Sequence, residues 1–265
     1  MPYAETNDPP SLRDTEIVIP ARFCGPDRSG NGGWVCGSVA AALVGRLGAA
    51  PGDTPVTVTL RVPPPLERPL VLRFAGAVGG VDLVDAAVSR PPSGSARRGD
   101  AVLVASAKPT GPMAEPTGLP SVTPQQAVAA RDGFPGLRHH PYERCYACGT
   151  DRAPGDGLRL TPAPIAGADP WWAAAWTPTE VSGPIVWAAL DCPTGWAAGA
   201  GGRYLLLGRM TARVRELPPV GTACVVLARC TGREGRKAYA ESFLCMDGRV
   251  VAQAATIWIE TQPQA

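Results

Sequence analysis

NGGWVCGSVAAALVGRL, residues 31–47, begins with a glycine-rich turn and continues as an apolar run with helical spacing. A second stretch of the same form, SGPIVWAALDCPTGWAAG, occupies residues 182–199, so the two starts are offset by 151 positions. A turn that leads into an apolar helix twice in one chain is the pattern of an internal repeat. The segments after each helix therefore decide whether the whole unit is repeated.

Two further landmarks recur at nearly the same offset. An Arg-Val pair before a proline break follows each predicted helix, and aligning Arg61 with Arg213 gives an offset of 152. Gly99 and Gly248 stand at the starts of the last predicted strands and give an offset of 149. Each half is therefore predicted to contain a strand, a helix and then several strands.

The strands alternate apolar and polar residues, which is typical of a half-buried antiparallel sheet. Val56, Val58 and Leu60 alternate with Thr57 and Thr59. Short turns between consecutive strands also favour antiparallel pairing, and one long helix per half must cover one sheet face. The predicted fold class is α+β, with two antiparallel sheets, each wrapped round a central helix.

The predicted units span residues 15–110 and 141–262, with their sheets joined edge to edge and their helices antiparallel. Residues 111–140 form a proline-rich linker, in which Thr123 and Pro124 are suited to begin a short helix as N-cap and first helical residue. Met246-Asp247-Gly248 is predicted to be a hairpin turn.

Charge and composition exclude several classes of function. Lys plus Arg number 25 and Asp plus Glu 23 among 265 residues, so the net charge of +2 favours neither nucleic acid nor membrane as a partner. Residues 1–14 lack the basic start and apolar run of an export signal, and no apolar stretch reaches the length of a spanning helix. Most of the eight cysteines lie in apolar runs, which indicates reduced thiols in a cytoplasmic protein.

The repeated unit resembles the hotdog-fold thioesterases, and most closely the PaaI-type acyl-CoA thioesterases. Their pattern is a His-Gly-Gly turn with an acidic residue nine positions after the histidine. Ser182-Gly183-Pro184 takes the turn position in the second half, and Asp191 stands nine residues after Ser182. In the first half Asn31-Gly32-Gly33 takes the turn position, and Ala40 stands where the acid is expected. CYACGTDRAPGDGLRL (145–160) and LDCPTGWAA (190–198) also resemble a subgroup of the family fused as tandem hotdogs.

Neither half keeps the turn histidine, the first half lacks the acid, and the second has Pro184 in place of a glycine. In hotdog pairs the turn of one unit faces the acid of its neighbour. The resemblance therefore implies one composite site, which joins Asn31-Gly32-Gly33 to Asp191. The same losses are equally expected of a pair that only binds its ligand.

Asp191, Asn31, Gly32 and Gly33 are the candidate catalytic residues. Asp191 stands in an apolar run, where a carboxylate is costly unless it is paired or functional, and it could act as a base or as a nucleophile. The alternative is an aspartate that bonds local backbone near Pro193. Asn31-Gly32-Gly33 opens a helix whose free N–H groups could form an oxyanion hole, although such a tripeptide is often only a turn.

Candidate substrate-binding residues are Trp34 and Trp187, beside the two helix starts, as the lining of an acyl pocket. Arg236 and Lys237 could face the phosphates of coenzyme A, or they could form a solvated hairpin tip.

We expect no metal. Cys145 and Cys148 form a CxxC pair, but zinc needs about four ligands, no second pair is present, and the adjacent His139 and His140 are poorly placed to share one ion.

The predicted function is hydrolysis of an acyl-CoA or carrier-bound thioester, with no cofactor other than the coenzyme A of the substrate. A hotdog dehydratase or hydratase is a second possibility, which needs a catalytic histidine. The alternative from another class is a non-catalytic acyl-thioester-binding protein. A homodimer of the double-hotdog chain is also expected to be possible.

Overall fold

The computed structural model describes residues 14–49, 52, 54–75, 79–89 and 101–262. The predicted landmark at Gly99 lies outside these residues. The first half contains β1 (Thr15–Val18), α1 (Gly32–Leu47), β2 (Val56–Leu60), β3 (Pro69–Ala75), β4 (Gly80–Ser89) and β5 (Ala101–Pro109). The second contains β6 (Ala163–Pro164), β7 (Trp172–Trp176), α3 (Gly183–Ala197), β8 (Leu205–Val214), β9 (Cys224–Glu234), β10 (Lys237–Met246) and β11 (Arg249–Glu260).

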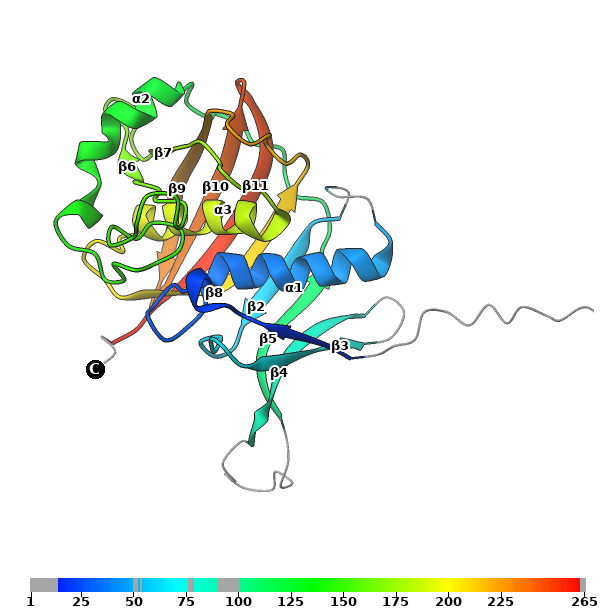
Figure 1. Cartoon of the computed structure of the whole chain (residues 1–265). Helices are drawn as coiled ribbons and strands as arrows, with labels where there is room; N and C mark the ends of the chain where they lie inside the picture. The colour runs from blue at the N-terminus through cyan, green and yellow to red at the C-terminus, as the bar shows by residue number, and fades with distance from the viewer. Residues whose placement is uncertain (1–13, 50–51, 53, 76–78, 90–100, 263–265) are drawn as a thin grey trace, which may run out of the picture.

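All these strands form one antiparallel sheet in the order β1-β3-β4-β5-β2-β8-β11-β10-β9-β7-β6. The halves have the same topology, because β7, β8, β9, β10 and β11 repeat the places of β1, β2, β3, β4 and β5 in reverse order across the sheet (Figure 1). The two predicted sheets are joined edge to edge, as expected, and so form one continuous sheet rather than two separate ones. Hydrogen bonds between β2 and β8 join the halves into one 11-stranded sheet.

The β2–β8 pair lies on a local twofold relation between the halves. Val58 is opposite Met210, which is its own equivalent at the offset of 152. On either side Thr57 faces Thr211, with 2.8 Å between their hydroxyl oxygens, and Thr59 faces Arg209. The strand at the inner edge of one half of the sheet, β2, thus pairs with the equivalent strand of the other half, β8. Two identical units would join in the same way.

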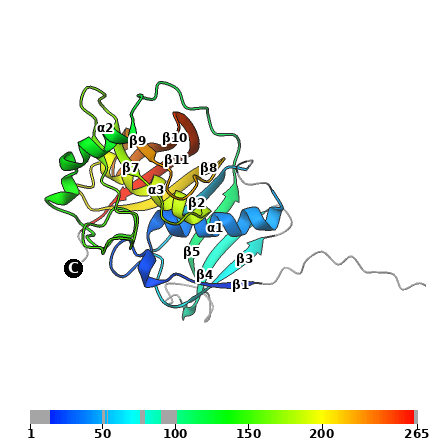
Figure 2. The same cartoon turned by 45° about the horizontal axis from the view of Figure 1, so that its top comes forward.

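The two helices lie on the same side of the sheet and pack against each other (Figures 1 and 2). A Cβ at Gly33 would lie 2.4 Å from the Cβ of Asp191, and one at Gly37 would lie 2.6 Å from the Cα of Pro184. From Gly33 to Gly37 the residue numbers increase along α1, whereas those of their α3 neighbours decrease from Asp191 to Pro184. The two helices are therefore antiparallel. Glycine is required at both positions for the backbones to approach this closely.

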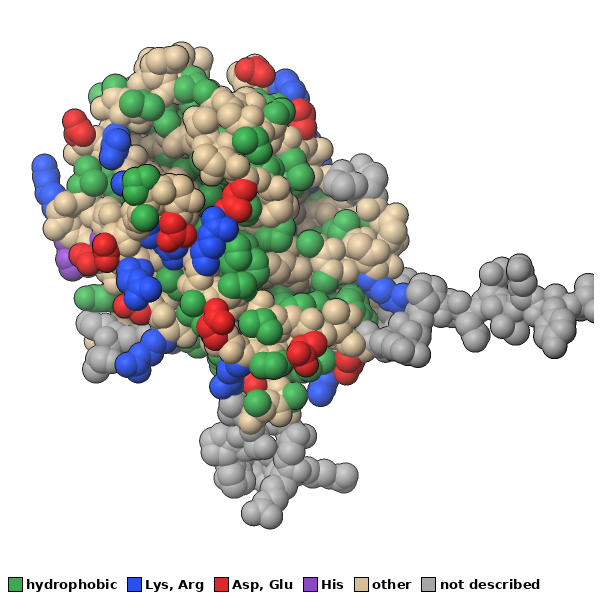
Figure 3. Space-filling model, in the orientation of Figure 1, with side chains coloured by type: hydrophobic (Ala, Val, Ile, Leu, Met, Phe, Trp, Pro, Cys, Tyr) green, Lys and Arg blue, Asp and Glu red, His purple; other side chains and the backbone are tan. Residues whose placement is uncertain are grey.

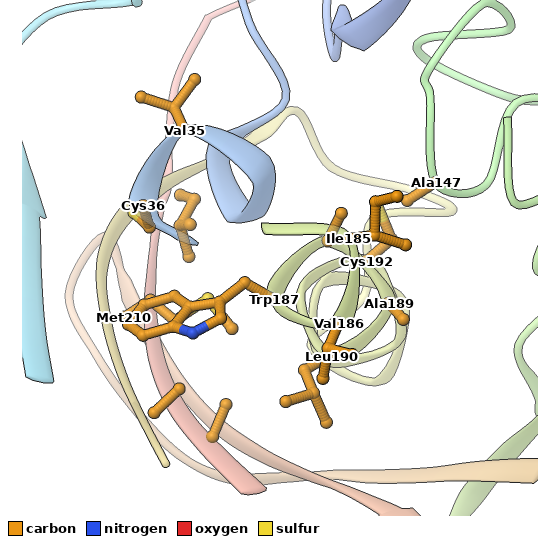
Figure 4. Close-up of a cluster of buried hydrophobic side chains, with 14 of the residues drawn as sticks. Val35, Cys36, Ala147, Ile185, Val186, Trp187, Ala189, Leu190, Cys192 and Met210 are labelled. Atoms are coloured by element: carbon orange, nitrogen blue, oxygen red, sulfur yellow. The ribbon is translucent and has the colours of Figure 1, made fainter. Parts of the chain in front are cut away.

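Apolar side chains fill the space between helices and sheet. Val35 and Cys36 on α1 and Leu190 on α3 are fully buried, and Trp187 extends from α3 towards Met210 of β8 (Figure 4). Burial of such side chains is the main favourable term in folding.

The segment between the halves has little regular structure. The helix α2 (Pro124–Ala129) has Thr123 as N-cap, a capping box with Gln126 and proline at its start, as predicted. Short 3-10 turns at Ala130–Gly133 and Pro135–Leu137 follow it, and another, Ala21–Phe23, precedes α1. The predicted hairpin at Asp247 and Gly248 joins β10 to β11 with positive φ angles at both residues. Within the described ranges, each helix is too short or too polar to cross a membrane.

The close approach of the helices predicts a large difference between two glycines of α1. Gly37→Ala should lower the free energy of unfolding by about 1–3 kcal/mol, because its methyl group would overlap the backbone of Pro184. Gly45→Ala is the matched control, because nothing lies within 4 Å of its Cβ position and alanine favours helix by roughly 0.5–1 kcal/mol. Urea unfolding of both variants checks this, and equal effects would contradict it.

Candidate active site

The start of α1 meets the middle of α3 at the centre of the molecule. Asn31 is the N-cap of α1, and the N–H of Gly33, the second residue of the helix, donates to Oδ2 of Asp191 at 2.8 Å. This contact joins residues 158 positions apart. The turn of the first half therefore faces the acid of the second, and the alternative that Asp191 bonds local backbone near Pro193 does not hold for its Oδ2.

Asp191 is almost completely removed from water. Its side chain is buried, and Oδ1 has no hydrogen-bond partner among the described residues. The hydroxyl of Thr194 donates to the Asp191 carbonyl at 2.6 Å, and the indole N–H of Trp258 donates to that hydroxyl at 2.8 Å. This chain of bonds fixes the α3 backbone at the carboxylate.

Burial raises the pKa of Asp191 to about 8, although the N–H of Gly33 and the side chain of Asn31 act in the opposite direction. A carboxylate in an apolar site loses more hydration than one N–H donor replaces. Strongly perturbed carboxyl groups in clefts are candidates for functional residues.

Asn31 connects the helix start to a group of thiols. Its Oδ1 accepts from the N–H of Trp34 at 2.9 Å, which caps the helix. That bond leaves Nδ2 to point the other way, 3.6 Å from Sγ of Cys145 and 3.7 Å from Sγ of Cys192. The amide therefore cannot turn without losing the cap.

A cavity of about 240 Å³ opens beside these residues and is lined mainly by apolar groups. Gly32 and Asp191 both line it, whereas Gly33 is covered. Its walls come from the loops at 25–32 and 60–64, from 140–148, and from the ends of β8 and β11. A pocket with apolar walls and few convergent polar groups is typical of a small-molecule site.

Three thiols lie at one end of this cavity. Sγ atoms of Cys145, Cys148 and Cys192 lie within 4.8 Å of one another, and all three residues are buried. Hydrogen bonds from Cys148 and Cys192 hold the pKa of the Cys145 thiol well below its usual range, and backbone N–H groups of Cys148 and Ala147 add to the effect. These are the residues in the described part of the chain that could hold a metal ion as a group of three or more.

His140 also lines the cavity, although it falls in the predicted linker. Its Nδ1 accepts from the N–H of Tyr142 at 3.0 Å, and its Nε2 lies 3.1 Å from the carbonyl oxygen of Cys148. The ring packs edge-on against Trp196, and burial lowers the pKa of His140. Since both ring nitrogens contact main chain, neither is free to act as a base for a hydratase.

The structure does not bring every predicted site residue into the cavity. Trp34 stacks on Phe23 with ring centroids 4.1 Å apart, and Trp187 packs between α3 and Met210, so neither lines it. Arg236 and Lys237 are exposed at the β9–β10 turn, although Lys237 pairs with Ile259, which does line it.

Several residues that the sequence did not single out for substrate binding also line the cavity. Trp196 and Trp258 form part of the cavity wall, as do His140 and Cys192. They come from the segment before Pro141, from α3 and from β11, which meet only in the folded protein, so spacing along the chain could not single them out.

A second junction of the same kind would join Ser182-Gly183-Pro184 to Ala40, and it lacks the same groups. Pro184 lies against Gly37, and Ala40 is buried in the α1 core, with no carboxylate at its position. Neither Gly183 nor Ala40 lines the described cavity.

On the face that Figure 3 shows, charged side chains of both signs are interspersed with hydrophobic ones, so this face has no large region of a single charge.

Comparison with known proteins establishes the fold. No family model matches the chain, and no curated protein matches it. Among solved structures it is similar to a "putative thioesterase" from Novosphingobium aromaticivorans, with 12% identity, a TM-score of 0.61 and coverage of 95% of this chain and 97% of that chain.

Two further structures agree over almost the whole length. A TesB protein from Mycobacterium avium subsp. paratuberculosis has 10% identity, a TM-score of 0.58 and 96% coverage of each chain. A conserved protein of unknown function with a hotdog fold, from Alicyclobacillus acidocaldarius, has 12% identity, a TM-score of 0.58 and coverage of 95% and 94%. The chain therefore has a double hotdog fold of the kind found in thioesterase-like proteins.

The N-cap role of Asn31 can be separated from its amide donors. Asn31→Ala should lower the free energy of unfolding by about 1–2 kcal/mol through loss of the cap to Trp34. Asn31→Ser should recover most of that loss, because its hydroxyl can accept the same N–H, although it removes the donors to the thiols. Chemical unfolding of the two variants measures the difference in their free energies of unfolding. Equal destabilisation would show that loss of the cap is not the main cause of the lower stability.

Proposed function

We propose that the protein hydrolyses an acyl thioester at the composite site between its two halves. The observation that carries this proposal is the contact between Gly33 and Asp191, beside a mainly apolar cavity that both Gly32 and Asp191 line. A carboxyl group and a free helix N-terminus from different units then face one small volume. That pair of groups is what acyl transfer to water requires.

Gly32 is the proposed oxyanion donor. Its N–H is the first of α1 and has no hydrogen-bond partner in the described ranges, because helix-start N–H groups lack intrahelical acceptors. The N–H of Gly33 is already used by Asp191. The positive end of the α1 dipole also favours negative charge at this point.

Asp191 is the proposed base or nucleophile. As a base, its carboxylate, which is the main form above a pH of about 8, removes a proton from water while the water oxygen attacks the thioester carbonyl carbon. The oxyanion then collapses, the carbon–sulfur bond breaks, and the thiolate takes the proton. As a nucleophile, the carboxylate oxygen attacks that carbon directly, the carbon–sulfur bond breaks, and the thiolate leaves and takes a proton from water. A second water molecule then hydrolyses the acyl-enzyme anhydride and regenerates the carboxylate.

The cavity walls favour an apolar acyl group, which Trp196, Leu207 and Trp258 would contact. Arg236 in the β9–β10 turn and Lys237 at the start of β10, opposite Ile259, are the proposed contacts for coenzyme A phosphates outside the cavity. All eight cysteines are free, which fits a reducing compartment, and we propose that the protein acts in the cytoplasm.

A protein that binds the same thioester without hydrolysing it is the alternative function, and the buried position of Asp191 is compatible with both hydrolysis and binding alone.

Asp191→Asn keeps the shape of the side chain and removes the carboxylate. Turnover of an acyl-CoA panel, followed by release of free thiol, should fall by roughly 10²–10⁴-fold while binding is largely kept. The control is Asp82→Asn, at an exposed carboxylate on β4. Near-normal hydrolysis by Asp191→Asn would reject its role, and absence of turnover in the wild type with retained binding would favour the binder.

The donor at Gly32 can be removed without changing the fold of α1. Proline is well tolerated at the first helical position and has no N–H. A Cβ at Gly32 would lie 2.8 Å from Leu207, so the substitution is made together with Leu207→Ala.

Gly32→Pro in this background should reduce turnover by roughly 10²–10³-fold relative to Gly32→Ala in the same background, which keeps the N–H. Steady-state rates of the two double variants measure the ratio, and a ratio near one would exclude Gly32 as the oxyanion donor.

A further inference from the structure

The three thiols at the end of the cavity come from two separate parts of the chain. Cys145 and Cys148 lie in the loop at 141–160, and Cys192 lies in α3 directly after Asp191. Figure 4 shows this packing, with Ala147 of the loop beside Ile185 and Cys192 of the helix. Sequence spacing shows only the CxxC pair, and the expectation of no metal was based on those two thiols. The fold adds the thiol of Cys192 as a third.

Their geometry matches a thiolate metal site. Zinc binds thiolate sulfur at about 2.3 Å in a tetrahedral arrangement, so two sulfur ligands of one ion lie about 3.8 Å apart. Sγ atoms of Cys145 and Cys192 are 3.6 Å apart, and all three sulfurs lie within 4.8 Å of one another. Small rotations of the side chains would bring them round one ion.

The loop is built to present its two thiols together. The N–H of Gly149 donates to the carbonyl of Cys145 at 2.8 Å, which closes a tight turn over the CxxC pair. A Cβ at Gly149 would lie 2.5 Å from the carbonyl oxygens of Cys145 and Glu143, so glycine is needed there. Further bonds from Tyr146 to Cys24 and from Leu160 to Ala147, at 2.7 and 2.9 Å, hold the turn in place.

Fixed donors also face the sulfurs. The Nδ2 group of Asn31, which the helix cap prevents from turning, lies 3.6–3.7 Å from the sulfurs of Cys145 and Cys192. Hydrogen bonds of this kind orient thiolate ligands and offset their charge in bound metal centres. His140 does not compete as a ligand, because both its nitrogens contact main chain.

We propose that Cys145, Cys148 and Cys192 bind one zinc ion. All three residues line the cavity, so the fourth tetrahedral position is open to a water molecule there. Binding replaces the protons of the thiols with the metal, and it ties the loop at 141–160 to α3. This proposal does not depend on the thioesterase activity.

The test uses the full chain, purified under reducing conditions, incubated with zinc and then desalted. Zinc content by mass spectrometry should be one ion per chain for the wild type and for the control Cys224→Ser, a buried thiol remote from the site. Cys192→Ser should bind zinc at least about tenfold more weakly. Replacement by cobalt should give thiolate charge-transfer absorption in the wild type that Cys192→Ser reduces.

A wild type that remains free of zinc, or equal zinc affinity in the wild type and Cys192→Ser, would overturn the proposal. Circular dichroism of each variant shows whether it folds, and Cys148→Ser replaces Cys192→Ser if the latter does not. Metal content is measured without substrate, so inactivity towards thioesters and absence of zinc remain separate results.

Discussion

The close contact between α1 and α3 at Gly33 is the constraint on which the rest of the structure depends. A side chain at this position would overlap Asp191 and the backbone of Trp187, so the helices reach this distance only because Gly33 has none. The same approach allows the Gly33 N–H to donate to the buried carboxylate at 2.8 Å. One residue therefore sets the helix spacing, provides the polar partner of Asp191 and places the start of α1 beside the cavity.

The join between β2 and β8 explains why the halves could diverge without losing the site. Because the strands pair about Val58 and Met210, the start of each helix faces the middle of the other. Two equivalent junctions would result from identical copies. Here the junction that contains Asn31 and Asp191 keeps both a donor turn and a carboxylate, whereas the other has Pro184 and Ala40.

The sequence predicted the repeat and the antiparallel order, because these follow from local pattern and an internal offset. The opposition of Asn31-Gly32-Gly33 to Asp191 was instead implied by the resemblance to hotdog pairs. The sequence predicted that the two sheets join edge to edge but not which strands form the join, since the β2–β8 hydrogen bonds depend on strand edges that have no signature of their own. Trp34 and Trp187 stand near the helix starts in the sequence, but helical rotation directs both side chains away from the cavity. Cys192 gains its partners Cys145 and Cys148 only when the loop folds onto α3. Contacts of that kind depend on tertiary packing that single-sequence spacing does not encode.

The central claim is that one composite site lies between Gly32 and Asp191. The most direct measurement is a crystal structure with a non-hydrolysable acyl-CoA analogue, together with its binding stoichiometry by calorimetry. The account predicts one equivalent per chain, with the carbonyl oxygen of the analogue at the Gly32 N–H and the carbonyl carbon facing Asp191. Two equivalents per chain, or a carbonyl beside Gly183 and Ala40, would contradict it.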